Sequence, residues 1–135
     1  MEAYAGRAAM EAEARRRQED GEKTDLFKLM EKHEKPRLTS SIWSRAIDHD
    51  DKLATELIDR AIEALGTGIG SAVNLLDPEA ILIGGGLGLR FGDRYMEPLL
   101  DEMRKHVFFE TMPVVKTATL GDLGGAIGAS LLVSP

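Results

Sequence analysis

The stretch from Asn74 to Gly88, with the sequence NLLDPEAILIGGGLG, constrains the fold more than any other part of the chain. Pro78 disfavours helical backbone at Asp77, so we expect the preceding helix to end there. The apolar run Ala80–Ile83 has no polar alternation, and it predicts a short strand that is buried on both faces. Glycines 84–86 follow directly, so the strand would lead into backbone that carries no Cβ atoms.

This glycine segment is the first candidate for a ligand contact. In parallel α/β sheets, ligands bind at the carboxyl ends of the strands, and a flat or phosphorylated molecule can approach glycine backbone closely. The residues expected to contact a nucleotide are Gly84, Gly85, Gly86, Leu87 and Gly88. A tight turn without a ligand is the alternative, because the segment has neither the Gly-Lys-Ser/Thr of a Walker loop nor a good Rossmann fingerprint. The residues alone leave both interpretations open.

The composition excludes several classes of protein. The 135 residues, 43% hydrophobic and 30% charged, predict one soluble globular domain with its own core. A net charge of −6 disfavours a general nucleic-acid binder, which would carry a basic face. The sequence has no cysteine, hence no disulfide and no thiolate zinc site in this chain. We find no signal peptide and no apolar run near the ~20 residues of a membrane helix, and we expect a cytoplasmic location.

Helical periodicity dominates the first part of the chain. Helices are expected over about 2–18, from 24 to 36, from 39 or 40 to about 47, and from 50 or 51 to 76. Trp43 is expected to anchor the core. The run Arg15-Arg16-Arg17 is interpreted as a solvated helix face, because acidic residues surround it. Residues 48–51 resemble a metal cluster, but we interpret them as a helix cap and turn.

The longest of these helices contains Gly66-Thr67-Gly68-Ile69-Gly70. Three glycines inside a helix cost roughly 1 kcal/mol each relative to alanine. Gly66, Gly70 and Asn74 fall on one face, so we expect another element to pack closely against a strip without Cβ atoms. The apolar period continues through the segment without a break, which argues against a phosphate loop here.

The remaining elements predict an α/β unit. We expect a helix over about 95–106, which Pro98 either starts or kinks, then a strand over 113–118. A final helix of small residues over 124–133 is expected to pack on a sheet. The strand–helix–strand part is a right-handed parallel β-α-β unit. Two strands are too few for a stable sheet, so we expect a partner or a larger protein to cover it, and a homo-oligomer rather than a monomer.

Several motifs resemble those of ROK proteins, the bacterial sugar kinases and sugar-responsive repressors. These motifs are residues 74–86, NLLDPEAILIGGG, residues 120–130, LGDLGGAIGAS, and residues 2–6, EAYAG. Residues 23–27, KTDLF, are similar to glucokinase-like members. The resemblance implies part of an actin-like, ribonuclease-H-like ATPase lobe, helix-rich with the short parallel unit. It covers residues 1–135 as the carboxy-terminal portion of a second lobe, with a helical segment over 1–50 and a nucleotide-side unit over 51–135.

The resemblance also implies roles for individual residues. Glu2 matches a glutamate that hydrogen-bonds sugar hydroxyls, and Gly84, Gly85 and Gly86 match a loop that lies against the adenosine and phosphates of ATP. The implied cofactor is ATP with magnesium, and the implied substrate is a hexose such as glucose. The structural zinc of the family is not supported by this chain. A nucleic acid is implied as a partner only if the parent protein is a repressor.

The departures from the family pattern limit what the chain is expected to do. The sequence lacks the Asp-x-Gly-x-Thr phosphate motif, the Asn-x-Asp segment with the catalytic aspartate, and the Glu-x-Gly-His sugar motif. Phosphoryl transfer depends on these positioning and basic groups, so we predict that this polypeptide alone does not phosphorylate sugar, and we assign it no catalytic residue. Met1 falls where the zinc motif would end, which suggests a truncated gene. The alternatives are the effector-binding part of a ROK repressor and a non-catalytic dimerising remnant.

Overall fold

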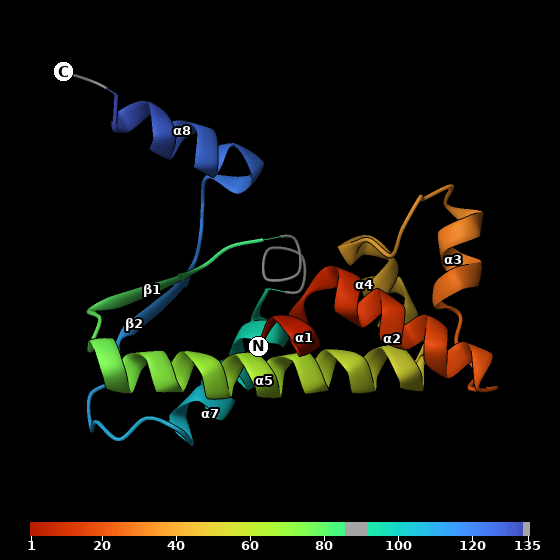
Figure 1. The fold of residues 1–135 in the computed structure, drawn as a ribbon, viewed down its shortest axis with the longest axis horizontal. Helices are drawn as coiled ribbons and strands as arrows, with labels where there is room; N and C mark the ends of the chain where they lie inside the picture. Colours follow the sequence, from red (N-terminus) through yellow and green to blue (C-terminus); the bar gives the residue numbers. More distant parts are fainter. Residues whose placement is uncertain (86–91, 134–135) are drawn as a thin grey trace.

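One long helix runs along most of the molecule (Figure 1). The computed structural model describes residues 1–85 and 92–133. The long helix is α5, Lys52–Leu76, and its bounds confirm the sequence prediction. Asp51 caps the amino end, because its side chain accepts a hydrogen bond from the Ala54 amide at 2.9 Å. Asp77, before Pro78, ends the helix in the left-handed conformation with a φ of 44°.

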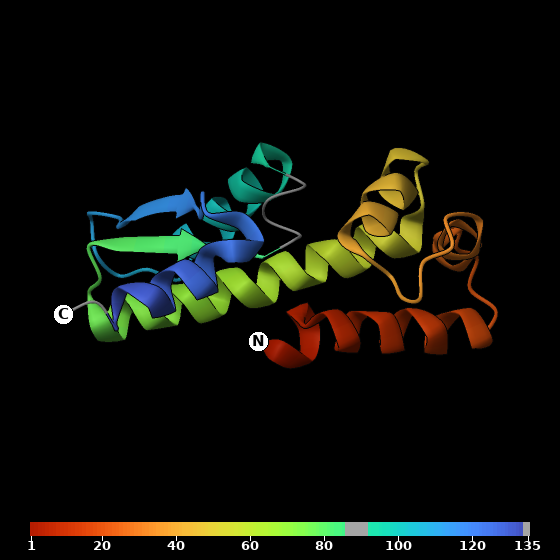
Figure 2. The ribbon, with the colours of Figure 1, turned by 90° about the horizontal axis from the view of Figure 1, so that it is seen from above.

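Four shorter helices pack near the first half of α5, as Figures 1 and 2 show. They are α1, Glu2–Ala5, α2, Arg7–Glu19, α3, Leu26–Lys32, and α4, Ser40–Asp48. Buried side chains of α2, α3 and α4 form one core with α5, and Trp43 is 2% exposed within it, as predicted. None of the described helices is both long and apolar enough to cross a membrane.

Two of the predicted helix boundaries were wrong. The single helix expected over 2–18 is broken at Gly6, whose φ of −69° and ψ of 136° are extended, and α2 continues to Glu19. A Cβ atom at Gly6 would lie 2.6 Å from the Glu2 carbonyl oxygen, so the tight break requires glycine. The second helix ends at Lys32 rather than just before Pro36, because the chain turns through Glu34 with a φ of 49°.

The glycine strip of α5 faces α7, Asp93–Arg104, which confirms the expectation that another element packs closely against it. A Cβ atom added to Gly66 would lie 2.7 Å from the Glu102 Cβ atom, and one added to Gly70 would lie 2.7 Å from the His106 Cβ atom. The two helices therefore approach more closely than any other residue at these two positions would allow. Pro98 neither starts α7 nor ends it, since it lies inside the helix.

Asn74 lies on the same side of α5 and fixes the segment that follows α7. Its amide nitrogen donates to the His106 carbonyl oxygen at 2.7 Å, and its amide oxygen accepts from the Phe108 amide at 2.9 Å. The side chain thus satisfies two backbone groups of a segment that has no ladder of its own. This connection determines where the chain enters the second strand.

The two strands form a parallel pair beside the second half of α5 (Figure 2). They are β1, Ala80–Ile83, and β2, Val114–Thr117, and Ala80 is paired with Val114. Ile83 and Val115 pack against the core. The expectation of a strand buried on both faces was wrong, because Leu82 on the opposite face is 70% exposed. Among the described residues, no layer covers that face.

The last helix does not pack on the sheet, so the expectation that it would do so was wrong. Helix α8, Gly124–Leu131, follows the short 3₁₀ turn η1, Gly121–Leu123. It buries none of its residues, and Leu131 is 70% exposed. Figure 1 shows it standing clear of α5 and the two strands. The described chain offers no surface that covers its apolar side chains.

Candidate functional site at the carboxyl end of β1

A pocket opens where β1 ends, in the position that the sequence favoured for a ligand. Its volume is about 360 Å³, within the range of roughly 300–1,000 Å³ that small-molecule sites occupy. Leu65 and Ile69 of α5 form one wall, and Tyr95 and Leu99 of α7 form another. The glycine turn and the amino-terminal segment complete the lining. The walls are mainly apolar, which suits a flat ring more than a sugar.

The glycine turn contributes bare backbone to this pocket. Gly84 and Gly85 both line it. Gly85 has a φ of +96°, a conformation that L side chains rarely adopt, so the turn itself requires glycine there. The Ala118 amide donates to the Ile83 carbonyl at 2.9 Å, which holds the ends of the two strands together just before the turn. Gly86, Leu87 and Gly88, also predicted to bind a nucleotide, lie outside the described residues.

Tyr95 is a buried aromatic residue in the wall of the pocket. The residue is 3% exposed. Burial raises the pKa of Tyr95 to about 12, because the charged phenolate would lose its hydration. The hydroxyl therefore stays protonated at neutral pH and carries no charge that would repel an anionic ligand.

Glu2, the predicted sugar contact, lies outside the glycine pocket. It is exposed on α1, and its carboxylate lies against the Cα atom of Gly6. The end of the same short helix does reach the pocket, since Ala5 lines it. The structure therefore places the two predicted contacts, Glu2 and the Gly84–Gly85 turn, at the two ends of one short helix.

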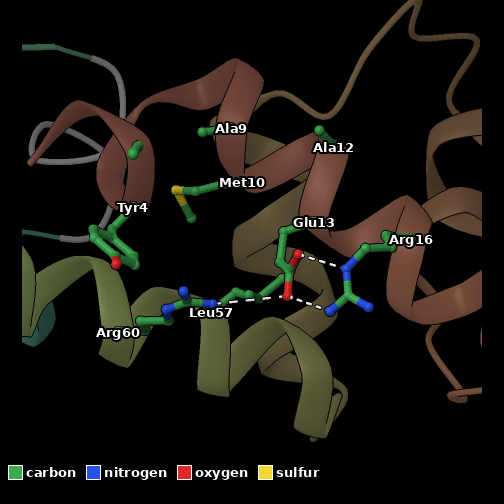
Figure 3. Close-up of a pocket in the computed structure, with 9 residues that line it drawn as sticks. Tyr4, Ala9, Met10, Ala12, Glu13, Arg16, Leu57 and Arg60 are labelled. Atoms are coloured by element: carbon green, nitrogen blue, oxygen red, sulfur yellow. Dashed lines mark hydrogen bonds and ion pairs between the residues drawn. The ribbon is translucent and has the colours of Figure 1, made fainter.

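An ion-pair network holds α1 and α2 against α5 (Figure 3). Arg16 donates two hydrogen bonds to the Glu13 carboxylate, at 3.0 and 2.9 Å, and the Arg60 Nη1 atom lies 3.7 Å from a Glu13 oxygen. The Arg60 guanidinium also lies over the Tyr4 ring, 4.6 Å from its centre. Hydrogen bonds from Arg16, then the positive charges of Arg16 and Arg60, lower the pKa of Glu13. The network lines a second, smaller pocket and fixes α1 beside the first.

Sequence reasoning missed the residues that the amino-terminal segment and α7 bring to the glycine turn. Ala5, Arg7 and Tyr95 line the pocket, but no pattern in the sequence connects them with Gly84 and Gly85. They meet there because α5 positions both α1 and α7 around the end of β1. Among the described residues, no group of three or more His, Cys, Asp or Glu side chains is arranged to hold a metal ion.

A comparison with protein families decides the relationship that the motifs suggested. A model described as the ROK family matches residues 1–135. The chain belongs to the ROK family. This confirms the resemblance, and the match includes the amino-terminal segment, the glycine turn and α8.

Curated relatives of this chain include sugar kinases. The chain is 37% identical over 83 residues to an N-acetyl-D-glucosamine kinase of Mannheimia succiniciproducens, covering 61% of this chain and 27% of that protein. It is 33% identical over 102 residues to a glucokinase of Halalkalibacterium halodurans, covering 71% of this chain and 29% of that protein. The chain thus spans less than a third of the length of these relatives.

Solved structures of ROK kinases share the fold. A ROK hexokinase from Thermus thermophilus matches 96% of this chain and 39% of its own, with a TM-score of 0.71 and 27% identity. A ROK glucokinase from Streptomyces griseus, in complex with glucose and AMPPNP, matches 97% of this chain and 43% of its own, with a TM-score of 0.75 and 23% identity. The expected fold class, part of an actin-like ATPase lobe, is confirmed by these neighbours.

Proposed function

We propose that this chain is the carboxy-terminal portion of an ATP-dependent hexose kinase of the glucokinase type. Its part in the reaction is to bind the nucleotide at the end of β1 and to hold one hydroxyl group of the sugar through Glu2. The reaction of the whole protein would transfer the γ-phosphoryl group of ATP to a sugar hydroxyl, giving ADP and a sugar phosphate. The observation that carries the proposal is the pocket at the Gly84–Gly85 turn, because it combines apolar walls with backbone that a nucleotide can approach closely.

The chemistry of the lining supports a purine ring in this pocket. Leu65, Ile69 and Leu99 offer the apolar surfaces between which a flat ring can be held. The turn at Gly85 leaves peptide groups free of side chains, so they can contact the ribose or the phosphates. ATP binding by the Streptomyces griseus glucokinase is consistent with this assignment, since that protein was solved with AMPPNP. When bound, magnesium would neutralise charge on the phosphates.

On this proposal, the chain binds but does not catalyse by itself. It carries neither the phosphate motif nor the aspartate that would accept the proton of the sugar hydroxyl. Glu2 can accept hydrogen bonds from the sugar and orient it, but it lies outside the pocket where the nucleotide would bind. We therefore expect nucleotide binding without measurable sugar phosphorylation from the isolated polypeptide.

The test is calorimetric titration of the purified chain with magnesium-ATP, using Gly85→Val and Gly21→Val. Both glycines have a φ of +96° and nothing within 4 Å of an added Cβ atom, so valine imposes the same backbone strain at each. Gly21 lies just beyond the end of α2 and does not line the pocket. We expect the native chain and Gly21→Val to bind ATP, and Gly85→Val to lose at least about tenfold in affinity because its side chain enters the nucleotide site.

Two outcomes would contradict the proposal. One is a native chain that is folded by circular dichroism and binds no nucleotide. The other is equal ATP affinity in both variants, which would mean that the glycine turn is only a tight turn. A sugar-phosphorylation assay on the same sample tests the expectation that the isolated chain does not catalyse, because turnover would refute a purely binding role.

A further inference from the structure

Arg7 is a cation at the edge of the glycine pocket, and it has no partner in the described part of the chain. It is the first residue of α2, it is exposed, and it lines the pocket beside Gly85. No carboxylate among the described residues forms an ion pair with it. Three later arginines of the same helix, Arg15, Arg16 and Arg17, are all paired with acidic side chains. Arg7 is therefore available to a ligand.

The rest of the pocket makes this charge informative. Apart from Arg7, the described lining consists of Gly84, Gly85, Ala5, the aromatic residue Tyr95 and aliphatic side chains, and it contains no other charged residue. A ligand matched to such a lining has an apolar, flat part and an anionic part that projects toward the amino end of α2. A nucleoside phosphate has this distribution of charge, whereas a neutral sugar or an apolar cofactor does not. Arginine is well suited to the anionic part, because its guanidinium group can donate two parallel hydrogen bonds to a phosphate.

The place of Arg7 in the chain points to the same part of the ligand. Arg7 follows the extended residue Gly6 at the start of α2, and Glu2 lies at the start of α1, the preceding helix. If Glu2 holds the sugar and the turn at Gly85 holds the purine, the group that joins them in the reaction is the phosphate chain. We propose that Arg7 binds the phosphates of the nucleotide and is a nucleotide-binding residue of this site. The inference rests on the proposed function, since it requires that the glycine pocket binds a nucleotide.

The competing role for Arg7 is stacking on the purine ring, and the two roles predict different ligand dependence. A contact with phosphate contributes to the binding of ATP and ADP but not of adenosine. A stacking contact contributes equally to all three, because the ring is common to them. A role in folding alone would lower the thermal midpoint of the variant without discriminating between the ligands.

The experiment compares ATP, ADP and adenosine as ligands of the native chain, Arg7→Gln, Arg7→Lys and Arg37→Gln. Arg37 is a matched control, since it is exposed, lies away from the glycine pocket and forms no ion pair among the described residues. We expect Arg7→Gln to lose roughly tenfold or more in affinity for ATP and ADP while its affinity for adenosine is unchanged. Arg7→Lys should retain part of the ATP affinity because it keeps the charge, and Arg37→Gln should bind all three ligands as the native chain does.

The outcomes separate this inference from the proposed function. If the native chain and Arg7→Gln bind ATP equally well and Gly85→Val does not, the role of Arg7 is refuted and the nucleotide site is supported. If Arg7→Gln weakens ATP and adenosine to the same extent, Arg7 contacts the base or supports the fold, and the phosphate contact is refuted. If the folded native chain binds none of the three ligands, the proposed function fails and the inference fails with it. Circular dichroism of each variant identifies a loss that comes from unfolding.

Discussion

Alanine substitutions in the glycine strip of α5 test whether the contact with α7 is as close as the structure indicates. Gly66 and Gly70 face α7, whereas Gly68 between them faces the Met1 side chain. In an ordinary helix interior, each Gly→Ala change stabilises by about 1 kcal/mol. Here the three glycines lie within five residues of the same helix, so the three substitutions can be compared directly with one another. The neighbour that each new methyl group meets determines the sign of the effect.

At Gly66 and Gly70 the added Cβ atom meets atoms that cannot rotate away. At Gly70 it would lie 2.7 Å from the His106 Cβ atom and 3.2 Å from the Met103 carbonyl oxygen. At Gly66 it would lie 2.7 Å from the Glu102 Cβ atom and 3.0 Å from the Met103 amide nitrogen. Carbon atoms in contact are about 3.5–4.0 Å apart, so α7 must move by roughly 1 Å.

Such overpacking costs about 1–3 kcal/mol, so after the gain in helix propensity we expect each variant to be less stable by about 1–2 kcal/mol. One displacement of α7 relieves both contacts. The double variant Gly66→Ala/Gly70→Ala should therefore lose less than the sum of the two single variants.

At Gly68 the added Cβ atom meets only the far end of a flexible side chain. The Met1 Cε atom lies 2.7 Å away, but rotation of the methionine side chain removes the contact. We expect Gly68→Ala to raise the free energy of unfolding by about 0.5–1 kcal/mol. The assay is urea denaturation followed by circular dichroism at a helical wavelength. If Gly70→Ala were as stable as Gly68→Ala, or more stable, the inference that α5 and α7 approach closely would be refuted.

Three other features of the structure give further predictions. Asn74→Ala removes both hydrogen bonds to the backbone after α7, and we expect urea denaturation to show a loss of about 1–2 kcal/mol; an unchanged midpoint would contradict the role of Asn74. Asp51→Ala removes the α5 cap and leaves the buried Thr24 hydroxyl and the Asp25 amide without their acceptor, so we expect a loss of about 2–4 kcal/mol. The exposed Asp59→Ala in the same helix should change stability by less than about 0.5 kcal/mol. Exposed apolar side chains on the open face of the sheet and on α8 predict self-association at micromolar concentration, and sedimentation velocity showing a stable monomer would refute it.

The parts of the fold that the sequence predicted well are those that local signals determine. Helix α5 was predictable from end to end, because Asp51 is a good cap, the apolar period is continuous and Pro78 stops helical backbone at Asp77. Its glycine strip was also predictable, since a costly run of glycines in a helix requires a compensating close contact. The strand before the glycine turn followed from its apolar run and its length.

The parts that sequence did not predict depend on contacts between distant segments. A glycine inside a helix costs only about 1 kcal/mol, so nothing local shows that Gly6 breaks the first helix. The break becomes evident once Tyr4 is seen against Arg60 of α5. The exposure of Leu82 depends on how many layers cover the sheet, which an apolar run does not encode. The glycine turn could be chosen as a candidate site because its residues are adjacent in the sequence. Arg7 and Tyr95 could not be assigned to it, because only the fold brings them close to the turn.

Helix α5 also connects the glycine pocket, which it lines, with α4, which packs against it. Its 25 residues extend about 38 Å at a rise of ~1.5 Å per residue. Leu65 and Ile69 in its second half line the glycine pocket, and α3 and α4 lie toward its amino end (Figure 1). A tilt of about 5° at Ile69 would displace Lys52, which lies about 26 Å away along the helix, by about 2 Å, which is large enough to measure. The natural absence of cysteine allows one spin label on Lys28 of α3 and one on Lys116 of β2 without removing any native thiol. The distance between those labels, with and without nucleotide, would report whether an event at the turn is transmitted along the helix.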